Sequence, residues 1–340
     1  MSKPLVVAID AMGGDSGPDL TVPACLELLR TLPDVSLILV GAADQIEPRL
    51  AGTSVRDRVE VVAASQVVEM GEPPADALRK KKDSSMRVAI NLVKEGRAKA
   101  CVSAGNTGAL MATSRFVLKT LPGIDRPAII SAIPAIGGHT HMLDLGANAD
   151  CTPKQLVQFA VMGTVVASDI HNIESPRVGL LNIGTEEIKG SDSIKLAGKF
   201  LTQSQLNYIG FVEGSDIMSG RVDVVVTDGF TGNVALKTME GMSRMLAATT
   251  RAEIENSVLN RIAAVAGWPL IRSLKKKLDP RAYNGASLVG LRGIVIKSHG
   301  SADALAYANA IRTAVVEIEK GVPTQIGELL EQQPEMEQMI

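Results

Sequence analysis

Aromatic residues are scarce in this sequence of 340 residues: they make up 3% of it, with a single tryptophan. Few side chains are therefore available to stack on bases, and a formal net charge of −2 gives no general attraction for nucleic acid. We expect no nucleic-acid partner. The core must instead be packed from Ala, Val, Ile, Leu and Gly, as in layered α/β proteins.

Cysteine and long hydrophobic runs are also scarce. The three cysteines, Cys25, Cys101 and Cys151, lie far apart without a CxxC pair, which favours a reducing compartment. No window reaches the roughly 18 uncharged apolar residues of a membrane span. The apolar run 5–9 is too short for the core of a signal peptide. These absences predict a cytoplasmic protein that can contact a membrane only peripherally.

Three sequence motifs of well-known enzyme sites are missing. The absence of G-x-x-x-x-G-K-[ST] disfavours a P-loop nucleotide hydrolase, and the absence of G-x-G-x-x-G after a strand disfavours a conventional dinucleotide site. No G-x-S-x-G is present either, so a nucleophilic serine elbow is not expected.

Apolar runs of strand length alternate with helical patterns along most of the chain. The runs are rich in Val and Ile and apolar on both faces, which is typical of strands buried between helices. This alternation predicts a three-layer α/β sandwich with a largely parallel sheet, formed by one catalytic domain over residues 1–340. The predicted strands are 5–9, 35–40, 59–63, 99–103, 127–133, 141–145, 177–183, 207–212, 222–228 and 293–297; the predicted helices include 19–31, 84–96, 106–119, 153–170, 191–204, 232–252 and 301–320.

Residues 253–282 depart from this alternation. Two consecutive helical patterns, broken near Gly267 and Pro269, predict a helical hairpin that projects from the sheet. An apolar stripe runs along both helices, Trp268 stands at the tip, and the lysines 275–277 lie alongside. This combination is typical of an interfacial membrane anchor, although a dimer interface or a helix pair in the core would show the same stripe.

Five of the apolar runs end in the same way, with a polar residue and glycine at the switch to a turn or helix. In open α/β sheets ligands bind outside the carboxyl ends of the strands, so we expect these five ends to converge on one cleft. Glycine lets the backbone approach a ligand, and helix N-termini direct unpaired N–H groups at it. The expected ligand is an anion, most simply phosphate. The ends read VVAID-AMGGD, ACVS-AGNTG, HMLDL-GAN, GLLN-IGTEE and VVVTD-GFTGN.

Aspartates at the strand ends and a His-Thr-His run raise the question of a metal. Asp10, Asp15, Asp144 and Asp228 could hold Mg²⁺, but isolated aspartates at such positions commonly cap turns and helices. The histidines of the run 139–141 have no third ligand nearby in sequence. We expect neither a metal nor a cofactor.

Few positive groups stand at these breaks: Lys189, Lys237, Lys297 and His299. A lysine in a glycine-rich polar turn is a suitable partner for a phosphate or an oxyanion, although a lysine at a helix start can also be simply solvated. Lys189 is favoured because glycines bracket it on both sides. His299 precedes a glycine and a helix, so it can either bind the ligand or cap the turn.

Seven motifs together resemble the bacterial acyl-acyl carrier protein:phosphate acyltransferase family, the PlsX family. They occur in order across nearly the whole chain, which makes the set far more specific than any one of them. The motifs are IDAMGGD (9–15), KKKDSSM (80–86), SAGNTGALM (103–111), LDLGAN (143–148), NIGTEEIKG (182–190), TDGFTGNVALK (227–237) and GLRGIVIKSHGSAD (290–303).

This resemblance implies transfer of a fatty acyl group from the acyl carrier protein thioester to inorganic phosphate, giving acyl phosphate for phospholipid synthesis. It also implies homodimers with a fold similar to those of phosphate acetyltransferases and isocitrate-type dehydrogenases. By motif, Lys189 and Asn233 become the catalytic residues. The residues implied in binding substrate and phosphate are Asp10, Gly13, Gly14, Asp15, Ser103, Gly105, Asn106, Thr107, Gly108, Asn148, Gly184, Thr185, Gly232, Lys297, His299 and Gly300.

The chemistry of that reaction agrees with the residues at hand. Phosphate is itself an anionic nucleophile, and a thiol leaves readily because its reference pKa is only about 8.5. The protein must then supply positioning and charge, with N–H groups and Lys189 holding phosphate and the Asn233 amide facing the developing oxyanion.

The resemblance also suggests partners beyond the substrate. The hairpin's base would lie at the dimer and its tip on lipid, where the membrane glycerol phosphate acyltransferase (PlsY) would be a further partner. The basic run 79–82 could receive an acidic carrier protein by charge complementarity, or could be only a solvated face.

Two other enzymes and one non-enzyme remain as alternatives. A short-chain phosphate acyltransferase using coenzyme A thioesters, or a dehydrogenase, would fit the same layered fold. A non-catalytic peripheral membrane scaffold of lipid synthesis would use the hairpin but would leave the five polar strand ends without a role.

Overall fold

The computed structural model describes residues 5–277 and 279–333, and its centre is one sheet of eleven strands. The strand order across the sheet is β3-β2-β1-β4-β11-β10-β5-β6-β9-β7-β8. The strands are β1 (Leu5–Asp10), β2 (Val35–Gly41), β3 (Val59–Ala63), β4 (Ala100–Ser103), β5 (Ala128–Ala135), β6 (Gly138–Leu143), β7 (Val178–Leu181), β8 (Tyr208–Val212), β9 (Val224–Val226), β10 (Ala286–Val289) and β11 (Ile294–Lys297).

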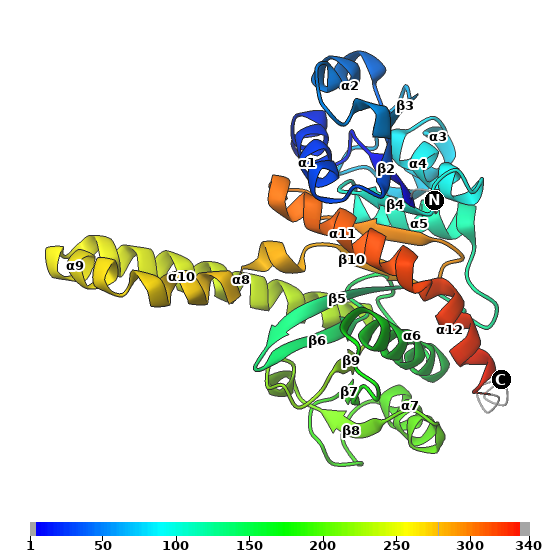
Figure 1. Ribbon diagram of the computed structural model, residues 1–340. Coiled ribbons are helices and arrows are strands. Elements are labelled where there is room, and N and C mark those ends of the chain that lie inside the picture. The colour runs from blue at the N-terminus through cyan, green and yellow to red at the C-terminus, as the bar shows by residue number, and fades with distance from the viewer. Residues whose placement is uncertain (1–4, 278, 334–340) are drawn as a thin grey trace.

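Helices cover both faces of this sheet, which confirms the predicted three-layer α/β fold (Figure 1). Successive residues of a strand point to opposite faces, and in β1 Ala8 packs with the α4 and α5 side while Val7 and Ile9 pack with α1 and α11. The helices are α1 (Pro18–Thr31), α2 (Ala43–Leu50), α3 (Pro74–Lys80), α4 (Ser85–Lys94), α5 (Thr107–Leu118), α6 (Pro153–His171), α7 (Asp192–Gln203), α8 (Gly229–Asn256), α9 (Val258–Ala266), α10 (Trp268–Lys277), α11 (Ala304–Lys320) and α12 (Val322–Glu331).

The sheet is not parallel throughout, and this changes where the strand ends lie. β10 runs antiparallel to both β11 and β5, and β5 runs antiparallel to β6. After these three reversals, β6, β9 and β7 point opposite to β1, β4 and β11. The five glycine-rich strand ends therefore do not all lie at one edge of the sheet. Those of β1 and β4 lie at one edge, and those of β6, β7 and β9 at the other.

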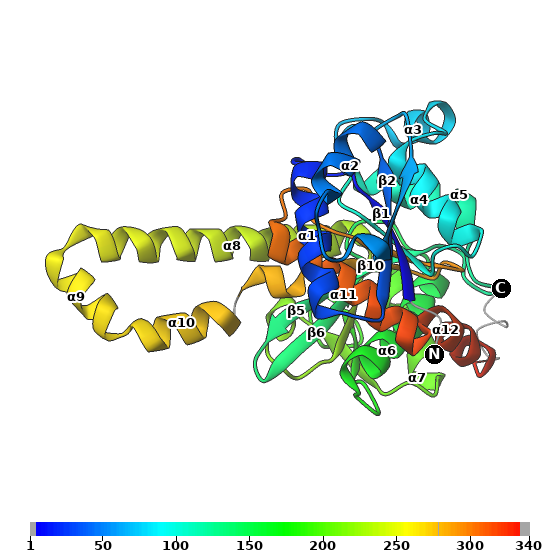
Figure 2. The same ribbon diagram turned by 45° about the horizontal axis from the view of Figure 1, so that its top comes forward.

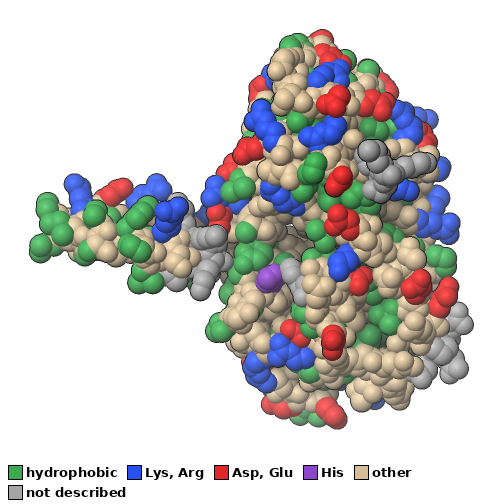
Figure 3. Space-filling model, viewed as in Figure 1, with side chains coloured by type: hydrophobic (Ala, Val, Ile, Leu, Met, Phe, Trp, Pro, Cys, Tyr) green, Lys and Arg blue, Asp and Glu red, His purple; other side chains and the backbone are tan. Residues whose placement is uncertain are grey.

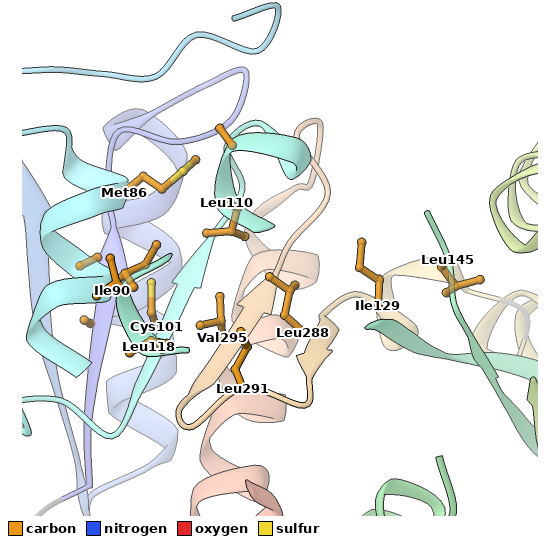
Figure 4. Packing of buried hydrophobic residues seen from close by; sticks show 14 of the residues in the cluster. Met86, Ile90, Cys101, Leu110, Leu118, Ile129, Leu145, Leu288, Leu291 and Val295 are labelled. Atoms are coloured by element: carbon orange, nitrogen blue, oxygen red, sulfur yellow. The ribbon is translucent and has the colours of Figure 1, made fainter. Parts of the chain in front are cut away.

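The hydrophobic core is continuous across the reversed strands. One buried cluster extends from α4 and α5 through β11 and β10 to the start of β5 and the end of β6 (Figure 4). Ile90 and Leu110 lie at one end of it, Val295 and Leu288 in the middle, and Leu145 at the far end. The two halves of the sheet therefore share one packed body.

An arm of three helices projects from that body (Figures 1 and 2). Helix α8 forms the outgoing limb, and α9 and α10 lie within the predicted hairpin 253–282, with the break between them at Gly267. Because α8 begins at Gly229 and ends at Asn256, the arm is longer than the hairpin and starts inside the body. In the described part of the chain, none of the helices has the length and apolar character needed to cross a bilayer.

Candidate functional site

The loop after β1 is tied to the loop after β4 by a buried hydrogen bond. Ser103 Oγ donates to Asp10 Oδ2 at 2.6 Å, and the Gly105 N–H donates to Ser103 Oγ at 3.1 Å. Burial raises the pKa of Asp10, while hydrogen bonds from Ser103 and Ser85 act in the opposite direction. Since Asp10 is only 1% exposed, its main contribution is to hold the two loops in place.

Two glycines allow these loops to lie against each other. A Cβ at Gly13 would sit 2.6 Å from Asp10 Oδ2 and 2.8 Å from the Gly105 nitrogen. Gly14 has φ of +91°, a conformation that side chains disfavour. Beyond them, the Asp15 N–H donates to the Gly300 carbonyl at 2.9 Å. The third loop of this edge, after β11, is thereby joined to the first.

Lys297 and His299 bring positive charge to this edge. Lys297 Nζ turns inward and donates to the carbonyls of Ala104, at 3.2 Å, and Ser298. Burial lowers the pKa of Lys297 to about 8, although Asp10 and Asp15 favour its charged form. Partial burial of the ring likewise lowers the pKa of His299. Among the described residues this amine pairs only with carbonyls, so its charge is suited to bind an anion brought to these loops.

The His299 ring also serves the turn that follows it. The Ser301 N–H donates to His299 Nδ1 at 3.3 Å, and the Ser301 hydroxyl lies 2.9 Å from the same nitrogen. The His299 N–H donates to Asn284 Oδ1 at 3.0 Å. Through Nδ1, His299 therefore caps the turn, which is one of the two roles that the sequence left open.

Helix α5 begins beside the same loops. Asn106 caps it by accepting the Ala109 N–H at 2.9 Å. The Asn106 amide donates to the carbonyls of Met70, at 2.7 Å, and Glu72, at 3.0 Å. The Asn106 side chain is thus hydrogen-bonded within the fold. Thr107 and Gly108, in the first turn of α5, are exposed. Free N–H groups and the positive end of the helix dipole make such a turn favourable for an anion.

Asp144 organises the second set of loops, at the opposite edge. Its carboxylate accepts four hydrogen bonds: from the N–H groups of Ile129 (2.9 Å), Ala147 (3.0 Å) and Asn148 (2.7 Å), and from the Asn148 amide (2.9 Å). The same amide donates to the Pro127 carbonyl at 2.8 Å. Asn148 is therefore buried and bonded inside the fold, so its side chain supports this loop.

Asn233 lies near the start of α8, in contact with this second set. Asp228 caps the helix by accepting the Thr231 N–H at 2.8 Å, and the Gly229 N–H donates to the Asn148 carbonyl at 2.7 Å. A Cβ at Gly146 would lie 3.5 Å from that of Asn233. The Asn233 side chain is exposed, so its amide remains available to a substrate.

Lys189 occupies a loop between β7 and α7 whose backbone is fixed. The Asn182 amide donates to the Lys189 carbonyl at 3.1 Å, and Gly190 has φ of +88°. The Lys189 side chain is exposed, as is that of Thr185, whereas Gly184 is buried. Among the contacts of the described residues, none joins Lys189 to Asn233 or to the loops after β1 and β4.

Helix α8 connects the two edges. Lys237 and Glu240 lie two turns beyond its start and form an ion pair of 2.9 Å. Both are close enough to His299 for their charges to act on its pKa, with Glu240 raising it and Lys237 lowering it. The charge on Lys237 also lowers the pKa of Lys297. The helix that carries Asn233 at one edge thus passes the cationic loop of the other.

Two residues that support the site were not among the predicted site residues. Asp144 is expected from the sequence to hold a metal or to cap a turn or helix, and the LDLGAN motif, with an Asp at the strand end and glycine two residues later, is the signal for its loop. Asn284 joins the end of the arm to the loop after β11, because its amide donates to Ser298 Oγ and to the Ala306 carbonyl, both at 2.8 Å. An Asn-Gly pair in sequence indicates only a turn, so no local signal pointed to this role.

The sequence model of one protein family, described as fatty acid synthesis protein, matches residues 5–325 of the chain. The chain belongs to this family. The phosphate acyltransferase of Alkalilimnicola ehrlichii is 58% identical to it over 333 residues, which cover 97% of each chain. The phosphate acyltransferase of Methylococcus capsulatus is 57% identical over 324 residues, or 95% of this chain and 96% of that one. The family resemblance predicted from the seven motifs is confirmed.

Solved structures resemble the fold at much lower sequence identity. A phosphotransacetylase from Streptococcus pyogenes superposes with a TM-score of 0.62 at 17% identity, covering 94% of this chain and 95% of that one. A phosphotransacetylase from Staphylococcus aureus gives a TM-score of 0.60 at 15% identity, covering 93% and 94%. The predicted similarity to the phosphate acetyltransferase fold is therefore confirmed.

Proposed function

We propose that this protein transfers a fatty acyl group from an acyl carrier protein thioester to inorganic phosphate, giving acyl phosphate for phospholipid synthesis. Near-full-length identity of 58% to a phosphate acyltransferase is the observation that carries the proposal. The site supports it, because the partly buried Lys297 amine and the exposed N-terminal turn of α5 lie at one edge and suit an anion. No nucleophilic side chain is required, since phosphate attacks directly.

In this reaction a phosphate oxygen attacks the thioester carbonyl carbon, and the carbon–sulfur bond then breaks. The negative charge moves first to the carbonyl oxygen and then to the departing thiolate. An amide donor such as Asn233 would stabilise the first of these charges, and Lys189 would hold the incoming phosphate. Lys297 would add charge from the loops after β4 and β11.

The proposal is tested by mixing the protein with palmitoyl-acyl carrier protein and phosphate and detecting palmitoyl phosphate by mass spectrometry. Palmitoyl-coenzyme A and acetyl-coenzyme A are the comparison donors. Formation of acyl phosphate from the carrier thioester is the expected result. Turnover of only acetyl-coenzyme A would support the short-chain alternative, and no acyl phosphate from any donor would favour the non-catalytic scaffold.

Phosphate binding should weaken as the pH rises through about 8. The pKa of Lys297 is lowered to about 8, so its amine is charged below that pH and loses its positive charge above it. The KM for phosphate is therefore expected to rise above pH 8, and Lys297→Arg should remove this inflection because Arg stays charged. Steady-state kinetics between pH 6.5 and 9.5 measure it; an unchanged inflection in the Arg variant would assign it to another group.

The arm supports a proposal about assembly and location. Its apolar side chains are exposed in the single chain, among them Leu259 (76%), Val265 (76%) and Trp268 (57%), and Figure 3 shows hydrophobic side chains along its surface. We infer that the arm's base packs in a homodimer and that its tip rests on lipid, as the apolar surface requires cover. Trp268→Glu should abolish sedimentation with anionic vesicles while leaving the dimer mass unchanged; retained sedimentation would exclude the lipid contact.

A further inference from the structure

A phenylalanine on the body surface lies between two cations. Phe116, near the end of α5, is 54% exposed. The Arg87 guanidinium carbon, from α4, lies 5.1 Å from the centre of its ring, and Lys119 Nζ lies 4.9 Å from it. Both distances fit cation–π contact. The two side chains keep the ring in place and surround an apolar spot with positive charge.

Two further cations adjoin this spot. Arg115 is exposed one turn before Lys119, and Arg292 donates from Nε to the Thr120 carbonyl at 3.0 Å and from its N–H to the Lys119 carbonyl at 3.1 Å. We call Arg87, Arg115, Phe116, Lys119 and Arg292 the Phe116 cluster. In the described ranges, the four cations of this cluster take part in no ion pair. Their charge is therefore available to a partner.

The residues around the cluster in sequence also carry more positive than negative charge. Between residues 84 and 120 the chain has six basic residues and a single acidic one, Glu95. The predicted docking run 79–82 differs, because Lys80 pairs with Asp76 at 3.2 Å and Lys81 pairs with Glu72 at 2.7 Å. Half of that run is already neutralised, so the Phe116 cluster is the stronger site for an acidic surface.

The elements that carry the cluster lead to both sets of loops. Helix α5 begins at the Asn106 cap, and ten residues of helix place Phe116 about 15 Å along it. Arg292 stands in the turn between β10 and β11, next to the end of β10, where Val289 pairs with Ala128 of β5. Asp144 accepts the N–H of the following residue, Ile129. The turn thus lies at the same edge as the second loop set.

We propose that an acyl carrier protein docks on the Phe116 cluster. An acidic helical face would meet the four cations, and an apolar side chain would cover the ring, while a flexible thioester arm spans the distance to the loops. This inference rests on the proposed function. The Phe116 cluster replaces the run 79–82 as the docking surface. The run 79–82 is then a solvated face, which is the second interpretation that the sequence allowed.

The test is kinetic and uses the full chain. In Arg115→Glu/Lys119→Glu both altered side chains are exposed, so the fold should be kept. The KM for palmitoyl-acyl carrier protein should rise about tenfold or more, with kcat and the KM for phosphate unchanged. Its dependence on salt should also weaken. Phe116→Ser should raise the same KM without changing the salt dependence, because it removes apolar contact and no charge.

Lys199→Glu is the matched control, since Lys199 is exposed on α7 in the other half of the sheet. It should leave the carrier KM unchanged. Equal effects of Lys199→Glu and Arg115→Glu/Lys119→Glu, or an unchanged KM in the latter, would overturn the docking surface while the function stands. A wild-type protein that accepts no carrier thioester would overturn the function itself. If Arg115→Glu/Lys119→Glu keeps the carrier KM but no longer forms the dimer, the cluster contacts a second copy of the chain. If it keeps the carrier KM but no longer binds vesicles, the cluster contacts lipid.

Discussion

Asn233→Ala should lower kcat by about 100-fold while leaving the melting temperature within a degree of the wild type. The Asn233 side chain is exposed at the start of α8 and, within the part of the chain that the structure describes, carries none of the hydrogen bonds that hold the loops. Its loss should therefore affect the chemistry and spare the fold. Asn233→Asp should be at least as poor, because a carboxylate cannot donate to an oxyanion and would repel it. Steady-state rates with the carrier thioester measure both variants.

The kcat of Lys189→Ala is the second measurement, to be compared with that of Asn233→Ala. If Lys189 and Asn233 act on the same transition state, the double variant should lose much less than the product of the two single losses. Thr238→Ala, an exposed position farther along α8, is the control and should retain full activity. Near-normal kcat in Asn233→Ala would remove this amide from the mechanism, and strictly multiplicative losses would separate the roles of the two residues.

Gly232→Ala should destabilise the protein by about 3 kcal/mol. A Cβ at this position would lie 1.9 Å from the Asp144 carbonyl oxygen and 3.0 Å from its carbon. These are backbone atoms in a loop fixed by the hydrogen bonds to the Asp144 carboxylate, so they cannot move aside without disturbing it. The shift in the midpoint of urea unfolding measures the loss, and kcat should fall as well because Asn233 is the next residue.

Gly241→Ala is a matched control on the same helix. Apart from its chain neighbours and the nearby backbone of its own helix, no heavy atom of the described residues lies within 4 Å of a Cβ built there. The change should therefore stabilise α8 by about 0.5 to 1 kcal/mol, since it removes backbone freedom from the unfolded chain. A Gly232→Ala variant as stable as Gly241→Ala would mean that the Asp144 loop tolerates displacement, and the proposed close contact would not be important.

Most of the sheet could be predicted because its strands are continuous apolar runs, and that signal is local. β10 was not predicted, because it has only four residues and two of them, Ala286 and Ser287, give a weak apolar strand pattern. The two antiparallel pairings of β10 cancel, so β5 runs in the same direction as β11, and the net reversal between the two halves of the sheet comes from the β5–β6 hairpin. The β5–β6 turn did carry a signal, as Gly137 and Gly138 separate two apolar runs in the manner of a hairpin. Without this hairpin the sheet looks parallel and its strand ends appear to share one edge.

The sequence predicts which residue types lie at the site, but it is less informative about the role of each side chain. Glycine-rich breaks located the loops, but sequence cannot tell whether a polar side chain faces the ligand or the fold. Asn148 and Asn233 have the same side chain, yet one is bonded inside a loop and the other is exposed. That difference is set by tertiary packing around Asp144, which involves residues from 127 to 148 and the start of α8.

The length of α8 fixes a distance between chemistry and membrane. From Asn233 to Asn256 the helix rises about 35 Å, slightly more than the hydrocarbon thickness of a bilayer. If the arm's tip rests on lipid, the reacting atoms stand that far from the surface. A long-chain acyl phosphate, an amphiphile with a hydrolysable anhydride bond, would then have to cross a layer of water or be handed over. With its tip on lipid, the arm would act as a spacer. A shorter arm would bring the acyl phosphate closer to the membrane and would leave less room for the carrier protein.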